Sequence, residues 1–168
     1  MRAHRWRALT LWPEWAWAIH ALDKRVENRH WRIPRGWVAI HAGAYLGGRP
    51  SAPAVLEAMR ALGLMSWRAG WRLDAGAHFV KEGREVDVPL LAAWPRSAIL
   101  GIAHFDGAIE RGGWAAPGAL ANHLDEYLPL DTPLPCRGAQ GLWPVPVEYA
   151  PTLRELHRLL GWAPLDER

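Results

Sequence analysis

Lys24, Glu27 and Arg29 have the residue types and the spacing that proton-transfer chemistry requires. They lie in the charged stretch LDKRVENRHW (22–31). A lysine beside a carboxylate can act as a general base or a nucleophile when burial lowers the pKa of its amine, and the carboxylate can hold or relay the proton. If VENR is extended, Glu27 and Arg29 face the same side, because side chains alternate along a strand. The same spacing also fits an ordinary ion pair at the surface.

Positive charge and tryptophan side chains gather around this stretch. The chain has a formal net charge of +3, yet residues 1–35 carry +5 and residues 36–168 carry −2. Flat aromatic faces beside arginine and lysine suit stacking on unpaired bases. The pattern therefore favours an anionic partner, nucleic acid first; the alternatives are a solvated basic face for the charges and core packing for each tryptophan. The tryptophans that interleave with the basic residues are Trp12, Trp15, Trp17, Trp31 and Trp37.

The elements that must position these side chains follow from hydrophobic runs and their period. The segment 112–134, rich in Gly, Pro and Ala, receives no assignment. A strand at 141–149 must lie at an edge, because Pro144 and Pro146 cannot donate to a ladder. Strands separated by a few helices predict an α+β fold with a small β-barrel and helices packed around it. The sequence predicts strands at 8–11, 36–43, 97–109 and 141–149, and helices at 13–23, 51–63 and 153–162, the last opened by a Thr152–Glu155 capping box.

Length and composition narrow the class of protein. A chain of 168 residues that is half apolar suits one domain (1–168), with a variable excursion at about 66–95. No apolar run approaches the roughly 18 residues of a membrane span, and the N-terminal residues lack a secretory signal, so we expect a cytoplasmic protein without a membrane partner. Cys136 is the single cysteine, and the eight histidines include no i, i+4 pair. We therefore predict no disulfide, no metal site and no cofactor.

Several stretches in order resemble the ASCH domain, a relative of the PUA-like RNA-binding fold. They are LTLWPEWAWAI, LDKRVENRHW, GWVAIHAG, AILGIAHF and LPCRGAQGLWPVP, and the resemblance covers most of the chain, residues 8–49 and 97–147. The family opens with a strand and a P-W-A helix and continues with a K-T-x-E-x-R segment. It then has a strand that ends in I-H-A, and it closes on a G-x-Q-G-L-W turn. Motifs in this order are more specific than any one of them.

The resemblance implies a polar cleft that faces RNA or a nucleoside. It places Lys24 and Glu27 at the family's cleft lysine and acid, and it makes them the expected catalytic pair. The chain departs from the family pattern in three places. Arg25 stands where the family usually has threonine, and Glu27 stands where the amidohydrolase members have threonine. The third departure is at Pro13–Glu14. The expected ligand-binding residues are Trp12, Trp15, Arg29, Trp31, Arg32, His41, Gln140 and Trp143.

Three functions remain open at this point. Members similar to this chain bind RNA, cleave RNA, or hydrolyse the acetyl amide of N4-acetylcytidine, and in the last group a lysine at the position of Lys24 is catalytic. The predicted function is binding of RNA or a modified nucleoside in the cleft, with hydrolysis of the acetyl amide as its reaction. A ribonuclease acting on single-stranded RNA and an RNA-binding module without chemistry are the alternatives.

Overall fold

The computed structural model of the chain describes residues 5–44, 77–81, 84–88 and 95–161. The helix predicted at 51–63 lies outside them. The described strands and longer helices are β1 (Arg7–Leu11), α1 (Pro13–Leu22), β2 (Val26–Arg29), β3 (Gly36–Ala42), β4 (Ala77–Lys81), β5 (Arg84–Val88), β6 (Ala98–Ile109), β7 (Leu120–Pro135), β8 (Leu142–Pro144) and α3 (Ala150–Arg158).

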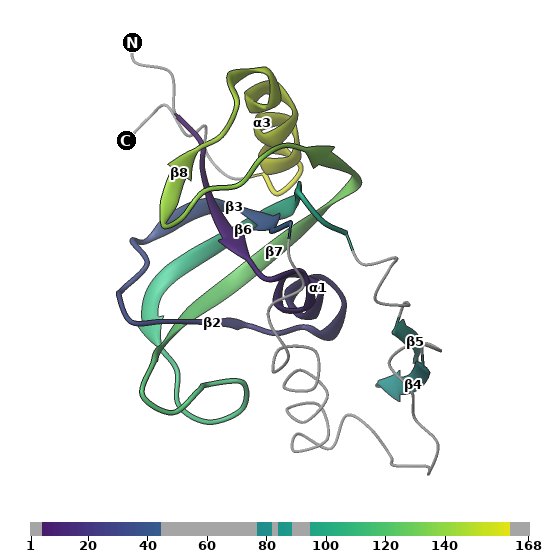
Figure 1. Cartoon of the computed structure of the whole chain (residues 1–168), viewed down its shortest axis with the longest axis vertical. Helices are drawn as coiled ribbons and strands as arrows, with labels where there is room; N and C mark the ends of the chain where they lie inside the picture. Colours follow the sequence, from purple (N-terminus) through teal and green to yellow (C-terminus); the bar gives the residue numbers. More distant parts are fainter. Residues whose placement is uncertain (1–4, 45–76, 82–83, 89–94, 162–168) are drawn as a thin grey trace.

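Six of the strands form one mixed sheet that curls into a half-barrel (Figure 1). Its order is β2-β7-β6-β3-β1-β8, with β1 parallel to β3 and the other pairs antiparallel. The prediction of an α+β, barrel-like fold is confirmed at this level. The strands predicted at 8–11, 36–43 and 97–109 and the helix at 13–23 agree with the structure within one residue at each end.

Two cores lie on opposite faces of the sheet. Successive side chains of β1 and β3 point to opposite faces of the sheet and so belong to different cores, as the two-residue period of a strand requires. Leu9 and Ile40 pack on the face that α1 covers, together with Ile19 of that helix. Ala8 and its neighbours pack on the other face, where Leu153 of α3 is buried. With both faces covered, the central strands read as continuous apolar runs, which is why they were predictable.

The long strand β7 occupies most of the segment that received no prediction. The prolines of β7 argue against a strand in the sequence, because proline lacks the amide proton that donates to the hydrogen-bond ladder of a sheet. Gly101 of β6 pairs with Pro129 at an irregularity in the register. A Cβ atom built on Gly101 would lie 2.2 Å from the carbonyl oxygen of Leu128 and 2.7 Å from the hydroxyl of Tyr127. Glycine is therefore required at position 101, where β6 pairs closely with β7.

The C-terminal part differs from the prediction in two places. The strand expected at 141–149 is reduced to β8, an edge strand, and a 3-10 helix, Val147–Tyr149, follows it. The predicted capping box is wrong, because α3 begins at Ala150 and Thr152 lies inside its first turn. Glu155 pairs instead with Arg158, at 3.0 Å between Oε2 and Nη1.

Strands β4 and β5, in the predicted excursion, form a two-stranded antiparallel sheet and pair with none of the other described strands. Figure 1 draws them apart from the six-stranded sheet. Among the described residues, no helix is long and apolar enough to cross a membrane.

Candidate functional site

The turn after α1 directs Lys24 into the protein. Asp23 ends the helix in the left-handed conformation, with φ 57°, and the amide of Lys24 donates to the carbonyl of Ala18. This reversal is a common way to end a helix, although the left-handed position is usually a glycine. The side chain of Lys24 therefore points inward, where a lysine that simply complements the helix dipole would point to solvent.

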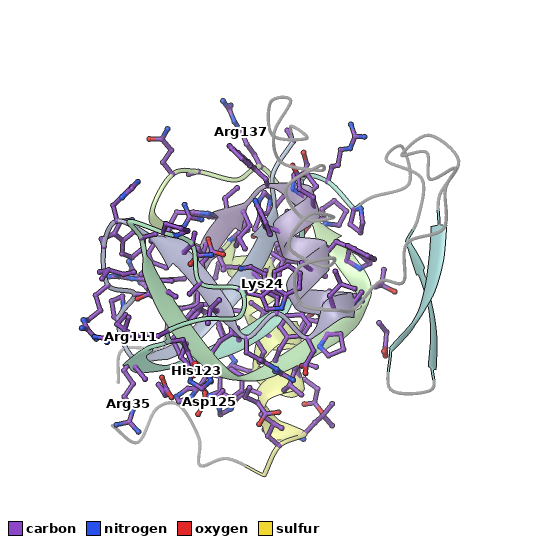
Figure 2. The ribbon with its side chains drawn as sticks, turned by 90° about the horizontal axis from the view of Figure 1, so that it is seen from below. Lys24, Arg35, Arg111, His123, Asp125 and Arg137 are labelled. Atoms are coloured by element: carbon purple, nitrogen blue, oxygen red, sulfur yellow. The ribbon has the colours of Figure 1, made fainter. Side chains whose placement is uncertain are left out.

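Lys24 is almost completely buried and hydrogen-bonded. Its residual exposure is 1%, and its ammonium nitrogen donates to the carbonyl of Val26 and to Oε2 of Glu27, the latter at 3.3 Å. The nitrogen also lies 5.5 Å from the centre of the Trp15 ring. The interpretation as an ordinary surface ion pair is excluded by this burial (Figure 2).

Glu27 joins Lys24 to Arg29. The second carboxylate oxygen of Glu27 lies 2.9 Å from Nε of Arg29, and Nη2 of Arg29 donates to the carbonyl of Thr10 at 2.8 Å. Glu27 and Arg29 belong to β2, and their contact fits the predicted placement on one side of the strand. One carboxylate thus lies between two cationic groups. We call Lys24, Glu27 and Arg29 the β2 triad.

Burial lowers the pKa of Lys24 below its usual value. The largest cause is the loss of hydration of the ammonium group; the attraction and hydrogen bond of Glu27 act in the opposite direction, and the positive charge of Arg29 lowers the pKa further. Because Glu27 already pairs with Arg29, loss of the Lys24 proton leaves the triad electrically neutral. The triad can therefore supply a neutral amine, which is the form that accepts a proton or attacks a carbonyl.

A cavity of about 370 Å³ lies beside Lys24 and Glu27. Two tryptophans, Trp15 of α1 and Trp114 of the loop between β6 and β7, line it with their rings perpendicular and 6.4 Å apart. We call it the tryptophan cavity. It combines flat aromatic walls, a buried amine and a carboxylate, which suits a planar ligand that carries a polar reacting group.

Asn28 fixes the loop that carries Trp114. Its side-chain amide donates to the carbonyl of Trp114, and its side-chain oxygen accepts from the amide of Ala116, both at 2.9 Å. Asn28 lines the tryptophan cavity beside Glu27, so β2 contributes Glu27 and Arg29 of the triad and also the residue that holds the loop. Sequence reasoning missed Trp114. The sequence Gly112-Gly113-Trp114, an aromatic residue after two glycines, is the signal that marks an aromatic on a surface loop.

A second, wider groove of about 1180 Å³ lies at the other end of the Glu27–Arg29 pair. Arg29 lines this groove, whereas Glu27 lines the tryptophan cavity. Trp12, at the start of α1, and Gln140, in the loop between β7 and β8, also line it. We call it the arginine groove. The predicted site residues are thus divided between two cavities rather than gathered in one cleft.

His41 is buried and its ring is held on both sides. Nδ1 lies 3.2 Å from the hydroxyl of Thr10 and Nε2 lies 3.0 Å from the carbonyl of Cys136. Trp143 donates to the same hydroxyl at 2.9 Å. A neutral ring with its proton on Nε2 satisfies the whole chain of donors, and burial lowers the pKa of His41, which favours that form. These contacts give His41 and Trp143 a structural function: they attach the 136–141 loop to the sheet.

Substituting Gly138 by alanine should destabilise the protein. A Cβ atom there would lie 2.5 Å from Cε1 of His41 and 2.7 Å from the hydroxyl of Thr10, so the loop must move. We expect a loss of about 1–3 kcal/mol in the free energy of unfolding, measured by urea denaturation. The exposed neighbour provides the control, since Ala139→Gly should change stability by less. Equal stability of Gly138→Ala and the wild type would contradict the close packing of His41.

Trp143, which contacts Thr10 and His41, lines neither cavity, and two further predicted binding residues lie apart from both. Trp31 is 37% exposed, and Arg32 donates to the carbonyl of Gly107 at 2.7 Å on the surface. Neither lines the tryptophan cavity or the arginine groove. The described residues also contain no group of three His, Cys, Asp or Glu side chains that can hold a metal ion.

The fold and the site together define a half-barrel protein with a lysine–carboxylate–arginine triad between two cavities. No protein-family model matches the chain, and no curated protein matches it.

Proposed function

We propose that the half-barrel is a PUA-like ASCH domain that binds a modified cytidine and hydrolyses the acetyl amide of N4-acetylcytidine. The observation that carries this proposal is the position of Lys24: a buried lysine, bonded to Glu27, borders a cavity with two tryptophan walls. The resemblance of the ordered motifs supports the class of substrate. The cavity volume lies at the lower end of the range for small-molecule sites, which suits a ligand about as large as a nucleoside.

In the proposed reaction, neutral Lys24 acts as a general base. It takes a proton from water while the oxygen of that water adds to the acetyl carbonyl carbon. The tetrahedral intermediate then breaks its bond to N4, and the Lys24 ammonium returns the proton to N4. Cytidine and acetic acid are released, the acid loses its remaining proton to water as acetate, and Lys24 is again neutral. Glu27 orients the amine through its hydrogen bond and favours the ammonium form that exists between the two steps.

Direct attack by the amine is the weaker mechanism. It would transfer the acetyl group to Lys24 and form acetyl-lysine, which is an amide as resistant to hydrolysis as the substrate. The enzyme would stop after one turnover. Intact-protein mass spectrometry during turnover distinguishes the two routes, since only the nucleophilic route adds an acetyl group to the chain.

Binding without chemistry is the second candidate function. The observation in its favour is the small exposure of Lys24, whose amine already donates to two oxygens. A ribonuclease is less well supported, because both ring nitrogens of His41, the histidine predicted in the cleft, are occupied by structural contacts.

The direct test is to incubate the protein with N4-acetylcytidine and, separately, with total RNA, and to identify the products by mass spectrometry. Release of cytidine and acetate supports the proposed hydrolase. Shortened RNA supports the ribonuclease. If neither product forms while cytidine binds, the protein belongs to the binding class.

Loss of the Trp114 ring should weaken ligand binding. Stacking of a base on an aromatic ring contributes about 1–3 kcal/mol, so Trp114→Ala should lower the affinity for cytidine by about 5- to 150-fold, and Trp114→Phe should lower it less. Isothermal titration calorimetry provides the measurement. Trp31→Ala is the matched control, because Trp31 lies outside both cavities. A larger effect of Trp31→Ala would move the binding site to the exposed surface.

A further inference from the structure

The arginine groove has a charge pattern that the proposed hydrolysis does not use. Among the described residues that line it, the two with charged side chains are both arginines, Arg29 and Arg137. Burial lowers the pKa of His41, which also lines the groove, whereas the hydrogen bond to the carbonyl of Cys136 acts in the opposite direction. Glu27, which lines the tryptophan cavity, pairs with Arg29, whereas Arg137 has no carboxylate partner among the described residues. Its walls therefore favour an anionic group.

Residues of the 137–140 loop line this groove together with Arg29. None of the four loop amides donates to a carbonyl of the described residues, and the loop is largely exposed. Gly138 presents its backbone without a side chain, because His41 and Thr10 leave no space for a Cβ atom. Successive backbone N–H groups beside arginine are the donors that phosphate oxygens accept from in proteins.

A single ion pair links a lining residue of one cavity to a lining residue of the other. Glu27 borders the tryptophan cavity, Arg29 borders the arginine groove, and their side chains are 2.9 Å apart. Nε of Arg29 lies beside Glu27 and Nη2 donates to Thr10, while Nη1 donates to no described residue. The guanidinium side chain is 27% exposed, so this nitrogen can reach a ligand in the groove. A ligand that occupies both spaces would place a planar group on one side of Arg29 and an anion on the other.

We propose that the arginine groove is a phosphate subsite, so that the ligand of the tryptophan cavity is a nucleotide unit rather than a free nucleoside. The base lies in the tryptophan cavity, against the ring of Trp15 or Trp114, and a phosphate of the same ligand lies against Arg29, Arg137 and the 137–140 amides. This inference rests on the proposed function for the position of the base. The phosphate belongs either to a mononucleotide or to a strand; Trp12, half-exposed at the groove, provides a stacking surface for a neighbouring base in the second case.

Binding of three probes tests the proposal: cytidine, cytidine 5′-monophosphate and the dinucleotide CpC, each titrated by calorimetry at low and high salt. We expect one or both phosphate-containing probes to bind at least about tenfold more tightly than cytidine at low salt, with the preference falling as salt rises. A preference for the monophosphate alone identifies a free nucleotide, and a preference for CpC alone identifies a strand. Equal affinity of all three probes would overturn the proposal.

The second part of the test repeats these titrations with the Arg137→Ala variant. This substitution should remove most of the phosphate preference and leave the affinity for cytidine unchanged. Arg111→Ala is the matched control, because Arg111 is an exposed arginine of the loop between β6 and β7, and Figure 2 shows it on the other side of the molecule from Arg137. Equal effects of the two substitutions would show a general charge effect and overturn the subsite.

The outcome is independent of catalysis. Hydrolysis of N4-acetylcytidine with no phosphate preference overturns the phosphate subsite and leaves the proposed function intact. A phosphate preference that depends on Arg137, without hydrolysis of any acetylated probe, supports the subsite and contradicts the hydrolase.

Discussion

Lys24→Ala should lower kcat/KM for N4-acetylcytidine by about 10²–10⁴-fold, which is the usual contribution of a general base. The amine is the group beside the tryptophan cavity whose pKa burial lowers, and the substitution removes it without changing the aromatic walls. The fall should appear in kcat, since binding of the base depends on Trp15 and Trp114. Steady-state kinetics with the nucleoside provides the measurement.

Two further variants separate chemistry from folding. Lys24→Met keeps an unbranched side chain of similar length in the buried site and should be as inactive as Lys24→Ala while it retains cytidine binding. Arg25→Ala is the neighbouring control: Arg25 is exposed and pairs with Asp23, so its loss should leave the rate unchanged. Activity of Lys24→Met close to that of the wild type would remove Lys24 from the mechanism.

The sequence predicts the parts of the fold in which local pattern and tertiary environment agree. Strands β1, β3 and β6 are continuous apolar runs because both of their faces are covered, and α1 has Pro13 in its first turn. The prediction failed for β7, because Pro129 and Pro135 in a long strand contradict local propensity. The irregular pairing of Pro129 with Gly101 accommodates it, and only the partner strand shows that pairing.

The same limit applies to the site. The spacing of Lys24, Glu27 and Arg29 predicted their proximity because all three lie within six residues. Spacing could not show their burial, which depends on the left-handed turn at Asp23. It also could not show Trp114, which reaches the cavity because Asn28 holds its loop from a distance of 86 residues in sequence.

Arg29→Gln should shift the pH dependence of hydrolysis to higher pH. The positive charge of Arg29 lowers the pKa of Lys24 and pairs with the carboxylate of Glu27. When that charge is absent, Glu27 holds the ammonium of Lys24 more strongly, so the pKa of Lys24 rises. The rate requires the neutral amine and therefore increases with pH up to that pKa. At a pH below the pKa of Lys24 in both the wild type and the variant, each unit by which that pKa rises lowers the fraction of neutral amine about tenfold.

The measurement is kcat/KM for N4-acetylcytidine across pH, which reports the ionisation of the free enzyme. The nucleoside is the right substrate here, because Arg29 also borders the arginine groove and a phosphate would add a second effect. We expect Arg29→Gln to be slower at neutral pH and to recover toward the wild-type rate in alkali. Arg32→Gln, which alters a surface arginine outside both cavities, should leave the profile in place. A uniform loss at every pH would mean that Arg29 only maintains the structure, and a shift toward lower pH would contradict the effect of Arg29 on the pKa of Lys24. A rate that falls as pH rises would show that the reaction depends on the ammonium form of Lys24.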